Sequence, residues 1–107
     1  GRYFVVDWKS NFLGTTLENY QRELLNAEMQ KTFYVLQYHL YVLATHLHLK
    51  MKLPGYVYER DFGGAFYMFL RGIDVSKGPE YGIFEDCPDI RMVDALGEAL
   101  IPDYDKI

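Results

Sequence analysis

The stretch Tyr3–Trp8, with the sequence YFVVDW, determines how the rest of the chain is interpreted. It is β-branched and aromatic, without polar alternation before Asp7, a pattern typical of a strand buried on both faces. A second apolar run, AFYMFL at residues 65–70, follows the breaker Gly63-Gly64 and predicts a central strand. Because helix-forming sequence separates the two runs, we expect parallel strands joined by a helical crossover, a right-handed βαβ unit.

The sequence between the two strands predicts two helices. Thr15 and Glu18 match a capping box at the start of a helix over Leu17–Lys31. A second helix covers Phe33–Met51, either continuous with the first or separated from it by a kink near Thr32. Its apolar stripe should face the core. The stripe consists of Leu36, Leu40, Leu43, Ala44 and Leu47.

Three shorter elements are expected elsewhere. Tyr56–Glu59 alternates weakly and predicts a short strand, and Tyr81–Phe84 predicts an edge strand. Asp89–Leu100 is typical of a last amphipathic helix, with Ile90, Val93, Leu96 and Leu100 inward. No internal repeat or interdomain linker interrupts the chain, so the sequence predicts one α/β domain.

Composition and charge exclude several classes of protein. With 107 residues, 50% hydrophobic and 24% charged, the chain is neither a disordered tail nor a fibre. A net charge of -4 gives no global positive field for free-standing nucleic-acid binding. The single cysteine, Cys87, excludes an intramolecular disulfide and fits a reducing cytosol. Because the chain opens with Gly1 rather than Met, we expect a piece of a longer protein, although tag removal gives the same start.

Asp7 and Lys9 are two residues apart at the end of the first predicted strand. Side chains alternate along a strand, so both emerge on one side, about 6.5 to 7 Å apart along the backbone. Burying either charge alone is costly. One interpretation is an ion pair at the rim of the sheet. The other is a metal-dependent phosphodiesterase, in which Asp7 holds Mg²⁺ and Lys9 stabilises developing negative charge or positions the nucleophile.

Gln37 and Tyr41 are spaced i, i+4 on the second predicted helix and are neighbours on one face. They lie on the flank of the apolar stripe rather than opposite it. They are either a satisfied, half-buried amide beside a tyrosine at the edge of the core, or a pair that hydrogen-bonds nucleic acid or braces a catalytic loop.

Three runs of sequence resemble a known family in order and spacing: VVDWKSN at 5–11, LQYHLY at 36–41 and FGGAFYMFLRG at 62–72. Together they are similar to the C-terminal nuclease domain of the RecB family, the beta subunits of exodeoxyribonuclease V, in the PD-(D/E)xK superfamily. The resemblance spans about residues 2–85. It implies a fragment of a restriction-endonuclease-like fold, a mixed sheet flanked by helices, in a bacterial cytoplasmic enzyme.

The resemblance implies roles for five residues. Asp7 matches the acidic residue of the Asp/Glu-x-Lys motif, a Mg²⁺ ligand, and Lys9 matches the catalytic lysine. Trp8 occupies the middle position, whose backbone carbonyl can also ligate the ion. Gln37 and Tyr41 match the Gln-x-x-x-Tyr motif, which lies near the DNA and the active site.

The family pattern also includes parts that should lie before residue 1. These are a further acidic metal ligand, in a Gly-x-x-Asp context on a preceding strand, and a histidine on a still earlier helix. We therefore expect residues 1–107 to be the C-terminal part of a RecB-like nuclease domain, holding half a metal site. Arg71 falls within the matching Phe-Leu-Arg-Gly segment but has no assigned chemical role.

The resemblance implies a Mg²⁺-dependent DNA exonuclease and endonuclease in a helicase-nuclease complex for double-strand-break repair and recombination. The parent protein would use ATP in its helicase part and would act on DNA with RecC-like and RecD-like subunits. The fragment alone should cleave weakly or not at all, and an unpaired sheet edge should promote its self-association. Two alternatives remain: a non-catalytic nuclease-like structural or DNA-contacting module, and an unrelated small βαβ binding domain.

Overall fold

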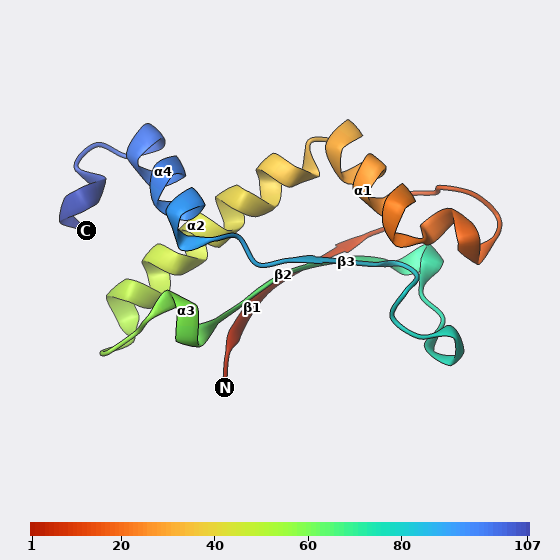
Figure 1. Ribbon diagram of the computed structural model, residues 1–107, viewed down its shortest axis with the longest axis horizontal. Helices are drawn as coiled ribbons and strands as arrows, with labels where there is room; N and C mark the ends of the chain where they lie inside the picture. The colour runs from red at the N-terminus through yellow and green to blue at the C-terminus, as the bar shows by residue number, and fades with distance from the viewer.

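The computed structural model describes residues 1–107 and contains a three-stranded mixed sheet with helices on one face (Figure 1). The strand order is β1 (Tyr3–Lys9), β2 (Phe62–Phe69) and β3 (Ile83–Asp86). β1 pairs in parallel with β2, and β2 pairs antiparallel with β3. The α/β class, the mixed sheet and the parallel pairing across a helical crossover are therefore confirmed.

The crossover from β1 to β2 contains a 3₁₀ helix (Leu17–Tyr20) and the helices α1 (Arg22–Lys31) and α2 (Tyr34–Lys52). The expected single helix over Leu17–Lys31 is thus divided in two. Its break is Gln21, whose backbone is extended and forms an isolated antiparallel bridge with Tyr81.

α1 and α2 are separate helices, because Phe33 between them has a left-handed backbone with φ of 61°. Of the two alternatives, a continuous helix or a separation near Thr32, the structure has the second. The capping box expected at Thr15 and Glu18 is wrong by one residue. Thr16 caps the 3₁₀ helix instead, and the side-chain oxygen of Asn19 accepts hydrogen bonds from both the backbone N–H and the hydroxyl of Thr16.

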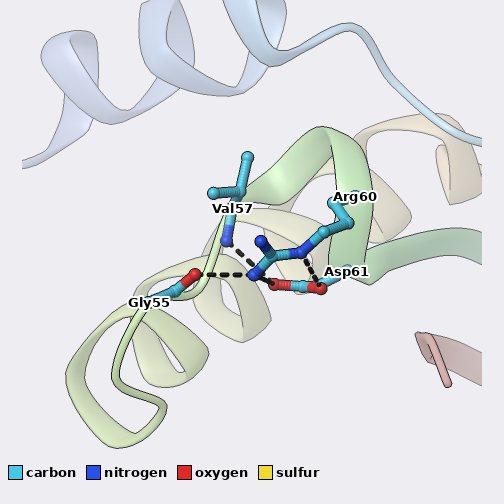
Figure 2. A network of polar contacts seen from close by, with 4 residues as sticks. All are labelled: Gly55, Val57, Arg60 and Asp61. Atoms are coloured by element: carbon cyan, nitrogen blue, oxygen red, sulfur yellow. Dashed lines mark hydrogen bonds and ion pairs between the residues drawn. The ribbon is translucent and has the colours of Figure 1, made fainter.

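The strand expected over Tyr56–Glu59 is wrong, because the chain forms a single helical turn there, α3 (Tyr58–Asp61). Figure 2 shows the polar network responsible. The Asp61 carboxylate accepts from the Val57 backbone N–H at 2.9 Å and from Arg60, while Arg60 also donates to the Gly55 carbonyl at 2.6 Å. These bonds, with the Arg60 guanidinium foremost, lower the pKa of Asp61 to about 2. The turn places the chain at the start of β2.

The helices cover one face of the sheet and leave the other open. α1, α2 and the last helix, α4 (Ile90–Leu100), lie on the same side in Figure 1. Ala65, Tyr67 and Phe69 of β2 point to that side and are fully buried. β1 lies at one edge of the sheet, and its side chains on the open face are about half exposed or more. These side chains are Phe4, Val6 and Trp8. The expectation that residues 3–8 are buried on both faces is therefore wrong for this chain.

The side of α2 that meets the sheet differs from the expected stripe. Leu36 and Leu40 are 54% and 39% exposed, although Leu43 is buried as expected. The residues of α2 that are buried are Tyr38, Val42, Leu43, His46 and Leu49. The helix is rotated so that aromatic and polar side chains, rather than the leucines alone, face β2. On α4, Val93 is buried as expected, whereas Leu100 is 55% exposed.

Candidate functional site around Lys9

Asp7 and Lys9 lie on the helix-facing side of β1 and form an ion pair. The Lys9 Nζ is 3.3 Å from Asp7 Oδ2, and the two side chains are 15% and 21% exposed. The expected placement on one side of the strand is confirmed. Solvent reaches both groups, so neither charge is sealed in a dry interior.

The side chain of Gln37, on α2, lies beside this pair and contacts Lys9. The Lys9 ammonium donates a hydrogen bond to Gln37 Oε1 at 3.2 Å, and the Tyr67 hydroxyl donates to the same oxygen at 2.5 Å. Tyr67 stands beside Asp7 in the β1–β2 register. Burial, with the nearby Asp7 carboxylate adding to it, raises the pKa of the Tyr67 phenol, so its proton stays in place as a donor. The site therefore joins two neighbouring strands and the crossover helix.

Two tyrosine rings lie against the Lys9 ammonium. Its Nζ is 4.2 Å from the centre of the Tyr34 ring and 5.3 Å from that of Tyr67, within the range of cation–π attraction. The Tyr34 hydroxyl donates to Asn11 Oδ1 at 3.2 Å, and Asn11 donates in turn to Glu28 at 2.8 Å. This chain of contacts fixes the Tyr34 ring between the end of β1 and α1.

Two of the expected site residues lie outside this network. Tyr41 is 41% exposed and its hydroxyl makes no hydrogen bond, although it is near enough to contribute to the raised pKa of Tyr67. The Trp8 side chain is 60% exposed on the opposite, open face of the sheet. The structure thus brings Asp7, Lys9 and Gln37 together and leaves Tyr41 at the margin.

The site offers part of what a magnesium ion needs. Mg²⁺ prefers oxygen ligands in octahedral geometry, and Asp7 supplies one accessible carboxylate. No group of three or more His, Cys, Asp or Glu side chains in the chain is arranged to hold a metal ion. The residues present fit one position of a Mg²⁺ shell rather than a whole one.

The three histidines lie outside the network of Asp7, Lys9 and Gln37. His39 contacts the Val35 carbonyl at 2.7 Å, and His48 is exposed. His46 is buried against Tyr56, with 3.0 Å between its Nδ1 and the Tyr56 hydroxyl. No helix in the structure combines the length and apolarity needed to cross a lipid bilayer.

Comparison with known proteins shows which family the chain is similar to. No protein-family model matches the chain. The RecB subunit of the RecBCD enzyme from Haemophilus influenzae is 47% identical over 96 residues, which is 90% of this chain and 8% of that relative. RecB of Escherichia coli is 41% identical over 98 residues, covering 92% of this chain and 8% of the relative. RecB of Mycobacterium tuberculosis is 38% identical over 104 residues, covering 92% and 10%.

Over this segment the chain belongs to the RecB family. The resemblance inferred from the three sequence runs is therefore confirmed. The chain spans only 8–10% of the length of these relatives.

In this RecB-type chain the Phe-Leu-Arg-Gly segment packs against the end of β1. Arg71 donates from Nε to the Ser10 carbonyl at 2.7 Å, and its guanidinium lies 5.9 Å from the Phe12 ring centre. Arg71 thus ties the turn after β2 to the segment that follows Lys9. The contact is structural within this chain and holds the strand end that carries the ion pair.

Sequence reasoning missed Tyr34 and Tyr67 as members of the site. Tyr34 precedes Gln37 by three residues, which places both on one helix face. Tyr67 lies two residues after Ala65 and two before Phe69, on the same side of β2. Both spacings can be found in the sequence. An aromatic residue in an apolar run is equally typical of core packing, however, so neither spacing indicated a functional residue.

Proposed function

We propose that this chain is part of the nuclease domain of a RecB-like helicase-nuclease, with a restriction-endonuclease-like fold. The proposed activity is Mg²⁺-dependent hydrolysis of DNA phosphodiester bonds, by exonuclease and endonuclease cleavage, in double-strand-break repair and recombination. The observation that carries the proposal is the accessible Asp7–Lys9 pair, at the end of β1, in a sequence 47% identical to a RecB subunit.

Each residue has a proposed role. Asp7, with the backbone carbonyl of Trp8, would hold part of the Mg²⁺ shell, and the bound ion would polarise the phosphate and activate water. Lys9 places a positive charge beside the reacting phosphate, where it offsets negative charge that develops on cleavage. Gln37 orients Lys9 through its side-chain oxygen, and Tyr41 lies at the margin where DNA would pass.

The parent protein should supply what this chain lacks. With a net charge of -4, the chain needs other parts of the complex to deliver DNA. The relatives are named as subunits of the RecBCD enzyme, and from this we infer RecC-like and RecD-like partners, and an ATP-driven helicase in the parent. We place the complex in the bacterial cytoplasm.

The isolated chain is proposed to be inactive and to self-associate. It supplies one carboxylate to a metal that needs several oxygen ligands, and it presents β1 as an unpaired edge beside the open apolar face. In isolation it therefore fits the alternative of a nuclease-like module without catalysis.

The experiment is Asp7→Ala in the full-length parent, assayed for Mg²⁺-dependent DNA cleavage and for ATP-driven unwinding. We expect cleavage to be abolished and unwinding to persist. Asp94→Asn is the matched control, because Asp94 accepts a hydrogen bond from Tyr104 far from the site and should leave both activities unchanged. Cleavage by the Asp7→Ala protein at the wild-type rate would remove Asp7 from the mechanism.

A further inference from the structure

We propose that Tyr34, Gln37 and Tyr67 form a lysine cradle that positions the Lys9 ammonium for cleavage. Tyr34 and Tyr67 are then positioning residues that act through Lys9. The inference rests on the proposed function, because it assumes that Lys9 acts on the phosphate.

The first step concerns how the flexible Lys9 side chain is held in one place. A lysine side chain has a flexible four-carbon stem and a compact charge with three donors. The partners of Lys9 within the cradle are an amide oxygen and two ring faces, and all of them attract a positive charge. Lys9 remains 15% exposed, so the ammonium is held while still within reach of solvent.

The second step is the orientation of the Gln37 amide. An ammonium only donates, so Gln37 must turn its oxygen, not its NH₂ group, toward Lys9. The Tyr67 hydroxyl donates to the second lone pair of the same oxygen. If the amide rotated by half a turn, it would lose the hydrogen bond from Lys9 and present its N–H groups to a positive charge, and the Tyr67 hydroxyl would have to accept rather than donate. Lys9 thus determines which end of the amide faces it, and the Tyr67 hydroxyl, which donates to the same oxygen, holds that oxygen beside the ammonium.

The third step is the support of the Tyr34 ring. Its face lies 4.2 Å from Lys9 Nζ, and its hydroxyl is held by Asn11, which follows β1 by two residues. The Tyr34 and Tyr67 rings are 5.6 Å apart at 48°. The two rings contact each other, and the ammonium lies beside both. The cradle thus draws on α2 and β2 to hold a residue of β1.

The test uses Tyr67→Phe and Gln37→Leu in the full-length parent, with steady-state cleavage of DNA ends. Tyr67→Phe keeps the ring and removes one hydroxyl. We expect kcat to fall about 5- to 10-fold for Tyr67→Phe and about 10- to 100-fold for Gln37→Leu, with KM within about twofold. Tyr38→Phe is the matched control: it removes a buried hydroxyl of α2 that donates to Asp86 instead, and kcat should not change.

The coupling between Tyr67→Phe and Gln37→Leu distinguishes a positioning role from a general effect on stability. In the Gln37→Leu protein, the added Tyr67→Phe change should have little further effect, because the hydroxyl then has no amide oxygen to hold. Tyr34→Phe should retain most of the wild-type kcat, since the ring face remains, whereas Tyr34→Leu should lose it. Unwinding driven by ATP should persist in every variant and report that the protein is folded.

Two outcomes are distinguishable. If Lys9→Ala leaves cleavage intact, the proposed function is wrong. If Lys9→Ala abolishes cleavage but Tyr67→Phe has the wild-type kcat, or if the Tyr67 and Gln37 losses multiply independently, the lysine cradle alone is overturned.

Discussion

Replacing Gly72 by alanine tests the packing that holds the Phe-Leu-Arg-Gly segment in place. A Cβ built at Gly72 would lie 2.2 Å from Cγ and 2.3 Å from Cβ of Tyr20, whereas carbon atoms in contact are about 3.5–4.0 Å apart. Tyr20 is 2% exposed, and its hydroxyl accepts from the Leu13 N–H at 3.0 Å. The base of the side chain blocks the new methyl group, so ring rotation does not relieve the overlap and the backbone must move.

The expected loss follows from two opposing terms. Forcing an extra methyl group into a well-packed site costs about 1–3 kcal/mol, and overlap with two atoms at the base of a buried ring places Gly72→Ala near the upper value. Replacing glycine also restricts the unfolded chain, which returns about 0.4–1 kcal/mol. We therefore expect a net loss of about 2 kcal/mol in the free energy of unfolding, or roughly 10 °C in Tm for a domain of this size.

The assay is urea and thermal unfolding followed by circular dichroism, in two backgrounds. With Tyr20 present, Gly72→Ala should give the full loss. A Tyr20→Gly background removes the three atoms nearest the new methyl group, including the Cβ, so Gly72→Ala should cost much less there. An equal loss in both backgrounds, or a Gly72→Ala chain as stable as the wild type, would refute the packing argument.

Two further predictions concern acid sensitivity and association. Burial, with Lys50 adding to it, lowers the pKa of His46 below its ordinary 6.5, so the unfolded state binds the proton more tightly. The free energy of unfolding should fall as pH drops below about 6.5, and His46→Phe should weaken that fall in urea titrations; an unchanged pH dependence would contradict this. Trp8→Lys, on the open sheet face, should reduce self-association in light scattering, and a wild-type chain that is monomeric at high concentration would exclude the proposed association.

The elements that local sequence dictates were predicted well. The apolar runs lie in the two parallel strands over residues 3–8 and 65–69, with Leu70 beginning a 3₁₀ helix, because continuous β-branched and aromatic sequence favours strands. The last helix after Asp89 was also correct, and the break near Thr32 was one of two alternatives that the sequence left open. The short strand at 56–59 was wrong because side-chain hydrogen bonds to Asp61, which a periodicity argument does not include, wind that segment into a turn.

What depends on packing between elements was predicted less well. Which side of α2 faces the sheet depends on the side chains that the sheet directs toward the helix. The Tyr67 hydroxyl of β2 donates a hydrogen bond to Gln37 of α2, so this side of the helix faces the sheet rather than the leucine stripe. Leu36 and Leu40 therefore lie outward, although both are apolar and fall on one helical stripe. The placement of Asp7 and Lys9 on one side of β1 needed only strand alternation, so the sequence was sufficient for it, whereas their ion pair was one of two interpretations.

The site also separates two requirements that a nuclease must meet together. Lys9 is held by residues of β1, α2 and β2, so one βαβ unit is enough to place the positive charge. A metal shell needs several oxygen ligands, and this unit contributes the single carboxylate of Asp7. Asp7 is paired with Lys9 in the structure, and in the proposed function it would turn to a cation while the ammonium keeps its other partners. The Gln37 oxygen and the tyrosine faces supply those partners, so under the proposed function the lysine cradle would hold Lys9 while Asp7 turns to the metal.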